Sequence, residues 1–110
     1  MKKLFLAACS LSLIAQAGTA SAQVTHDFKL ALDVHEDSSR PCMLFRLEGV
    51  SLADPASGNE WFAVPRTHIA FSELFALLLT SRALRLPLLV STTGALSCGY
   101  ASVNAILIRN

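Results

Sequence analysis

The chain has 110 residues, 53% of them hydrophobic, with nine Lys and Arg against eight Asp and Glu and a formal net charge of +1. This near balance of charge excludes the strongly basic surface with which nucleic-acid-binding proteins hold phosphates, so we expect no nucleic-acid partner. The length allows one small domain with a modest core, which often needs a covalent or metal staple.

The N-terminal segment has the pattern of a secretory signal peptide. Met1-Lys2-Lys3 is basic, residues 4–17 are mostly apolar, and Ala20-Ser21-Ala22 supplies the small residues that precede a cleavage site. The sequence therefore predicts a signal peptide over 1–22 and a single domain over 23–110, exported to the periplasm or outside the cell. The apolar run is too short to span a bilayer, so we expect no membrane insertion.

The residues around Cys9 also allow an alternative interpretation of the leader, as that of a lipoprotein. Leu6-Ala7-Ala8-Cys9 has the form of a bacterial lipoprotein cleavage site, but the apolar run continues to Ala15, which favours ordinary secretion. Removal of Lys2 and Lys3 with the leader leaves seven basic residues against eight acidic ones, a net charge of −1.

The exported part keeps two cysteines, Cys42 and Cys98, which permit a single intramolecular pairing. An oxidising compartment favours a disulfide between them. Because the two positions lie 56 residues apart, the chain-entropy model gives the bond a stabilising contribution of about 4 kcal/mol. A metal or redox pair would instead call for a closely spaced motif such as CxxC, which is absent.

Period-two alternation predicts the first strands. Residues 23–37 place Phe28, Leu30, Leu32 and Val34 on one side and polar residues on the other, as in a half-buried strand. A polar connection over 36–41 leads to a second strand over 42–52. In this strand Gly49 accompanies a change of apolar phase that is typical of a bulge or corner. After a turn at 54–59, residues 61–64 form a short third strand.

Apolar residues at helical spacing follow from Phe71. The helix begins between Thr67 and Ala70, and its polar face is narrow, which predicts burial on most sides. Pro87 marks the joint to a fourth strand over 88–93. A loop over 94–99 then leads to a fifth strand over 100–109, which is apolar on both sides and would lie beneath the helix or in a subunit interface.

Three strands, one helix and two strands predict a mostly β domain with one helix. This order is that of a small five-stranded OB-like barrel, with the arrangement β-β-β-α-β-β. The alternative left open by element order and size is an open α+β sheet.

The segment Ala70-Phe71-Ser72-Glu73-Leu74-Phe75, with the helix and strand after it, resembles the B subunits of bacterial toxins of the subtilase-cytotoxin and pertussis type. The resemblance covers residues 71 to 108. It implies an exported, disulfide-containing OB-fold domain that assembles into rings and binds sialylated glycans. Two departures stand out: the joint at 84–87 lacks the glycine of a left-handed cap, and no serine-centred sugar pocket is matched.

These observations predict a small exported, non-catalytic binding protein that recognises a glycan or a protein surface and forms a homo-oligomer. The alternative is a periplasmic structural or regulatory protein-interaction domain. The candidate ligand-binding residues are Trp61, whose ring could stack on a sugar, and Tyr100, whose hydroxyl lies beside the predicted disulfide. The competing interpretations are that Trp61 packs in the core and that Tyr100 only covers the bridge.

No motif for catalysis or for a metal is visible. His26, His35 and His68 lack ligand spacing, and Ser72 and Ser91, like Ser102, have no adjacent base and acid in the sequence. There is also no GxSxG elbow and no glycine-rich phosphate loop, so we expect neither an enzyme nor a cofactor.

Overall fold

The computed structural model describes residues 23–36 and 39–109. The predicted leader, residues 1–22, lies outside the described residues, as do Asp37 and Ser38 of the predicted polar connection. The described chain contains, in order, β1 (Thr25–Lys29), β2 (Ala31–His35), β3 (Cys42–Leu47), β4 (Phe62–Pro65), α2 (Phe71–Leu84), β5 (Leu88–Ser97) and β6 (Tyr100–Ile108). The prediction of a mostly β domain with one helix is confirmed for these residues.

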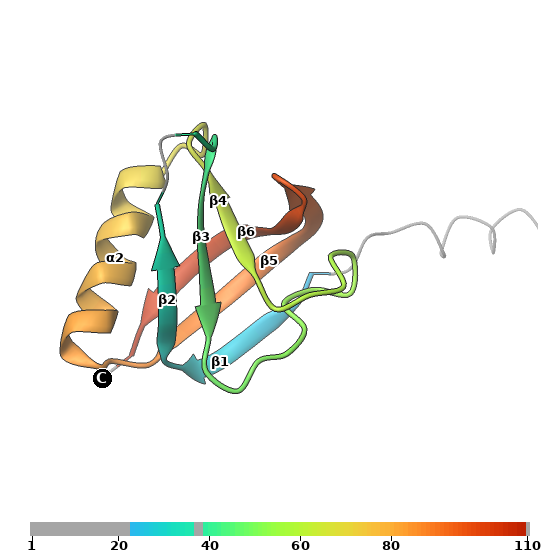
Figure 1. Cartoon of the computed structure of the whole chain (residues 1–110). Helices are drawn as coiled ribbons and strands as arrows, with labels where there is room; N and C mark the ends of the chain where they lie inside the picture. Colours follow the sequence, from blue (N-terminus) through green and yellow to red (C-terminus); the bar gives the residue numbers. More distant parts are fainter. Residues whose placement is uncertain (1–22, 37–38, 110) are drawn as a thin grey trace, which may run out of the picture.

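The predicted five-stranded closed barrel is wrong, because the sheet has six strands and is open. Its order is β1-β5-β6-β4-β3-β2, with β4 and β6 parallel and all other neighbours antiparallel. The β5–β6 pair runs diagonally behind β2, β3 and β4 (Figure 1), which shows how strongly the sheet is twisted.

The sixth strand arises because the predicted first strand is divided in two. Phe28 has a positive φ of 57°, and the pairing register shifts on both sides of Leu30, the residue between β1 and β2. The bend sends the first half to β5 and the second half to β3, so the two halves form opposite edges of the sheet. A positive φ at a bulky residue is costly and persists only where its surroundings hold it.

The main core lies between the inner face of the sheet and α2, which lies along one side of the sheet in Figure 1. Phe45 of β3 and Phe62 of β4 are completely buried and stack with ring centroids 5.1 Å apart. Leu74 and Leu78 are the buried leucines that α2 contributes to this core.

Neither a side-chain cap at the N-terminus nor a glycine at the C-terminus holds the ends of α2. Ala70 is the N-cap residue and makes no side-chain cap, so Thr67 does not fill that role. At the C-terminus, Arg85 takes the left-handed conformation that glycine usually supplies. The Ser81 hydroxyl donates to the Leu86 carbonyl oxygen at 2.6 Å, and the Leu86 amide donates to the Ser81 carbonyl oxygen at 3.0 Å, which closes the joint.

The expectation that the helix is buried on most sides is also wrong. Its exposed residues are mostly apolar or small, with one acidic and one basic side chain among them: Ser72, Glu73, Ala76, Leu79, Thr80, Arg82, Ala83 and Leu84. The core needs only the face that carries Leu74 and Leu78, and within the described residues nothing covers the opposite face. No helix in the described part of the chain is long and apolar enough to cross a membrane.

Two strand boundaries also differ from the prediction. β3 ends at Leu47, because Gly49 takes a positive φ of 78° and the Val50 amide turns back to the Leu47 carbonyl oxygen. The predicted loop over 94–99 is mostly strand, since β5 continues to Ser97. β5 and β6 therefore form one long hairpin.

The alternation along β6 changes phase part-way. Ser91 pairs with Ala105 while Thr92 pairs with Val103, so an extra residue is accommodated on β6. Val103 and Ile106 are therefore both buried, whereas Leu107, which uninterrupted alternation would place on the same face as Val103, is 49% exposed.

Candidate functional site

Trp61 and Tyr100 lie together on the outer face of the sheet, away from α2. Phe62 pairs with Ala101 in the parallel β4–β6 ladder, and Trp61 and Tyr100 are the residues immediately before this pair. Phe62 is completely buried while Trp61 is half-buried, so these two neighbours point to opposite faces, as alternation along an extended segment predicts. Tyr100 is also half-buried.

Both aromatic rings pack on a small second cluster, formed by the buried residues Cys42, Leu44 and Ala63. These residues lie on the strand face opposite the main core, because Met43 and Phe45, which alternate with them, point into that core. Each ring therefore covers apolar surface and keeps part of its own surface open to solvent.

A disulfide joins Cys42 to Cys98 with a Cα–Cα distance of 6.4 Å, so the predicted pairing is confirmed. Cys98 and Gly99, with φ of 55° and 84°, form the two-residue turn between β5 and β6. Two positive φ values are characteristic of a type I′ hairpin turn. The bond ties this turn, and with it Tyr100, to the start of β3.

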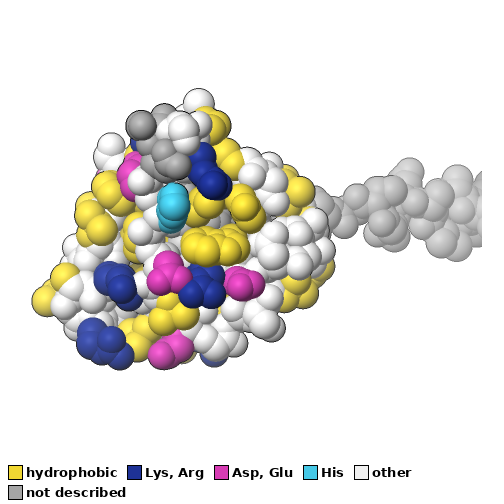
Figure 2. Space-filling view, viewed as in Figure 1, with side chains coloured by type: hydrophobic (Ala, Val, Ile, Leu, Met, Phe, Trp, Pro, Cys, Tyr) yellow, Lys and Arg dark blue, Asp and Glu magenta, His cyan; other side chains and the backbone are white. Residues whose placement is uncertain are grey.

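A charged cluster borders the aromatic pair. Arg46 of β3 donates from Nε and Nη2 to Asp33 Oδ2 of β2, the Nε contact being 2.8 Å. Its Nη1 lies 3.6 Å from Glu60 Oε1, and its guanidinium carbon lies 5.3 Å from the centroid of the Trp61 ring. Figure 2 shows a basic side chain between two acidic ones on this face, with hydrophobic surface beside them.

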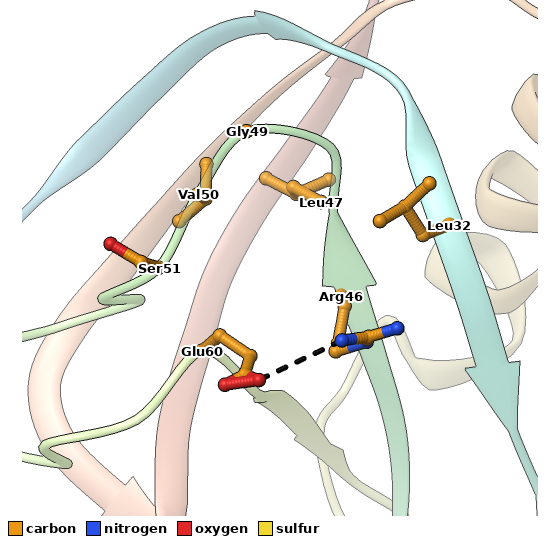
Figure 3. Close-up of a pocket in the computed structure, with 7 residues that line it drawn as sticks. All are labelled: Leu32, Arg46, Leu47, Gly49, Val50, Ser51 and Glu60. Atoms are coloured by element: carbon orange, nitrogen blue, oxygen red, sulfur yellow. Dashed lines mark ion pairs between the residues drawn. The ribbon is translucent and has the colours of Figure 1, made fainter.

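A shallow cleft of about 410 Å³ opens beside this cluster. Leu32, Leu47 and Val50 line its apolar part, while Ser51 and Glu60 belong to its polar part together with Arg46 and Gly49. In Figure 3, Glu60 reaches toward Arg46 from the chain segment opposite β3, and Leu32 projects from β2. The cleft thus lies between β2, β3 and the loop that follows β3.

The loop that carries Ser51 and Glu60 is anchored by a buried carboxylate. Asp54 is 2% exposed; it accepts from the Thr92 hydroxyl of β5 at 2.5 Å and from the Ala56 amide at 2.9 Å. The His26 ring contacts the Ala53 carbonyl oxygen at 2.8 Å through Nε2. These contacts fix the loop against β1 and β5, and so determine where Glu60 and Trp61 lie.

The other candidates from the sequence are scattered. The Ser102 hydroxyl is bonded to that of Ser97 at 2.8 Å, Ser72 lies on the exposed face of α2, and His68 Nδ1 accepts from the Ala70 amide at 3.0 Å. No group of three His, Cys, Asp or Glu side chains that could hold a metal ion occurs among the residues the structure describes.

The sequence did not predict the Arg46 cluster or the cleft. A partial signal existed, because alternation places Asp33 and Arg46 on the polar sides of their strands. Which strands are neighbours, however, comes only from the sheet order, and Glu60 comes from a loop. No protein-family model matches the chain, and no curated protein matches it closely enough to indicate a relative.

Proposed function

We propose that this protein is an exported, non-catalytic binding module whose ligand is a glycan, and that Trp61 and Tyr100 form the contact surface. The observation that carries the proposal is the position of the two rings. They are the half-buried aromatics of one sheet face, packed on Cys42, Leu44 and Ala63 and bordered by Arg46. Flat aromatic surface next to hydrogen-bonding groups suits the apolar face and the hydroxyls of a sugar ring.

Export is part of the same proposal. The leader pattern at 1–22 supports it, and the Cys42–Cys98 disulfide agrees with an oxidising compartment, either the periplasm or the exterior of the cell. The resemblance to toxin B subunits supports glycan binding and a ring-like homo-oligomer. The order of strands and helix is similar to that of an OB fold, except that the first strand is bent into β1 and β2. These two halves form the two edges of an open sheet.

A glycan array probed with the oxidised protein tests the proposal. We expect selective binding to a subset of glycans and its loss in Trp61→Ala. The matched control is Phe28→Ala, because Phe28 is likewise an accessible aromatic residue beside an arginine. Its exposed fraction is 52%, and the guanidinium carbon of Arg109 lies 5.1 Å from its ring centroid. Binding that survives Trp61→Ala, or an array with no positive glycan, would refute the proposed glycan site.

A second candidate function is protein interaction through α2. Its outward face exposes Leu79 at 47% and Leu84 at 64%, and Ile69 just before the helix is 98% exposed. Exposed apolar surface of this kind is typical of protein contacts, including contacts between identical subunits. Sedimentation of the parent and of Leu79→Glu tests this candidate: a parent oligomer that dissociates in the variant supports it, and a monomeric parent counts against self-association.

A further inference from the structure

The cleft beside the Arg46 cluster is lined by apolar side chains and by two opposite charges, those of Arg46 and Glu60. Among its apolar lining residues, Leu32 and Val50 are half-buried and so accessible, whereas Leu47 is nearly fully buried. A ligand group that fits here needs an aliphatic portion to cover the leucine and valine side chains. It also needs a polar end that agrees with the charges at the rim.

The charges at the rim favour a cation. Arg46 and Glu60 line the cleft, whereas Asp33 pairs with Arg46 from outside the lining, so that the three side chains together carry a net charge of −1. Arg46 directs Nε and Nη2 to Asp33, whereas Glu60 has only the looser 3.6 Å contact. An anion would have to displace a carboxylate from Arg46 and then lie beside it. A cation can approach Glu60 and leave the Arg46–Asp33 pair intact.

We propose that this cleft receives a lysine side chain from a partner protein. Lysine combines a flexible four-carbon stem, which covers apolar surface, with a compact ammonium group that remains close to solvent. Its stem would lie on Leu32 and Val50, and its ammonium would lie beside Glu60. This subsite does not depend on glycan binding at Trp61 and Tyr100, so either proposal can fail while the other holds.

The probes are two small molecules with the same four-carbon chain: n-butylamine, which is a cation at neutral pH, and pentanoate, which is an anion. Backbone amide chemical shifts of the oxidised protein report where each binds. We expect n-butylamine to give saturable shifts at Gly49, Val50 and Ser51, and pentanoate to give none. A short peptide with one central lysine should shift the same amides, and the same peptide with that lysine acetylated on Nε should not.

Two variants test whether the Glu60 carboxylate is the group that selects a cation. Glu60→Gln should weaken n-butylamine binding about threefold to fivefold, as expected for the loss of a partly exposed ion pair. The matched control Glu73→Gln removes the same charge from α2, outside the cleft, and should leave the affinity unchanged. Unchanged melting temperatures would show that both variants remain folded.

If pentanoate gives shifts equal to those of n-butylamine, or if Glu60→Gln and Glu73→Gln bind n-butylamine equally well, the proposed preference of the cleft for a cation is wrong. No amide shift at the cleft with n-butylamine would overturn the subsite itself. Shifts with n-butylamine but none with the lysine peptide would overturn the protein partner and leave a site for free aliphatic amines.

Discussion

The two faces of the sheet are covered in different ways. On the inner face, Phe45 and Phe62 are completely buried in one core together with Leu78 of α2. On the outer face, a much smaller cluster is covered by the half-exposed rings of Trp61 and Tyr100, beside a disulfide. The inner face therefore supplies most of the hydrophobic stabilisation, while the outer face combines a little burial with accessible aromatic and charged groups.

The largest expected effect comes from the inner face. Replacing Leu78, which is 0% exposed, with Ala leaves a cavity between α2 and the sheet. We expect the free energy of unfolding to fall by about 2–5 kcal/mol. Chemical denaturation measures this loss. The exposed control Leu79→Ala on the same helix should change stability by less than about 1 kcal/mol; equal losses would contradict the assigned orientation of α2.

The disulfide should give the next largest effect, and one that reaches the outer face. Cys98→Ser is expected to lower the free energy of unfolding by about 2–4 kcal/mol. It should also increase acrylamide quenching of Trp61, because the hairpin turn is released from Cys42. Thermal melts and fluorescence measure both quantities.

A second variant separates the bond from the turn. Cys98→Asn also removes the disulfide but suits the positive φ of 55° at this position, so it should be slightly more stable than Cys98→Ser. A melting temperature that hardly changes, together with two free thiols in the parent protein, would show that the bond is absent.

The loop between β3 and β4, which Asp54 anchors to Thr92, should have an intermediate effect on the free energy of unfolding. Thr92→Val keeps the shape of the side chain but removes the hydroxyl that donates to the buried Asp54 carboxylate. We expect a loss of about 1–3 kcal/mol, because a buried acceptor loses its partner. Thr92→Ser retains the hydroxyl and should lose much less. If both variants are equally stable in denaturation, Asp54 does not anchor the loop.

The smallest stability effect is expected in the charged cluster. Asp33 and Arg46 are exposed by 51% and 34% of their side-chain area, so solvent screens their ion pair. Asp33→Asn should therefore change the free energy of unfolding by less than about 1 kcal/mol. Denaturation of Asp33→Asn beside Thr92→Val tests this ranking. A loss as large as that in Thr92→Val would mean that the Asp33–Arg46 ion pair contributes substantially to the stability of the fold.

Parts of this structure could be predicted from the sequence because they depend on local signals. Alternation indicates that the neighbours Trp61 and Phe62 point to opposite faces, although not which of them faces outward. Helical spacing located the helix, and two cysteines allowed only one intramolecular bond. In each case neighbouring residues, or simple counting, carried the information. Only the structure shows that Trp61 is the outward-facing ring of the two, and its role in ligand binding stays a prediction.

The bend between β1 and β2 could not be predicted. The apolar alternation runs through Phe28 and Leu30 without interruption, and neither Gly nor Pro marks the bend. The phase change in β6 was hidden in a similar way, because Ala105 to Ile108 are all apolar and either phase would bury some of them. Pairing with β5 decides between the two phases, and pairing is a property of the assembled sheet.

Trp61 is the only tryptophan of the chain, so its fluorescence is the most direct test of the outer face as a binding surface. Titration of the oxidised protein with a glycan that is positive on the array should change the Trp61 emission saturably and reduce its quenching by acrylamide. Phe28→Ala should behave like the parent protein. Saturable glycan binding, measured calorimetrically, with no change in Trp61 emission or quenching would contradict the account.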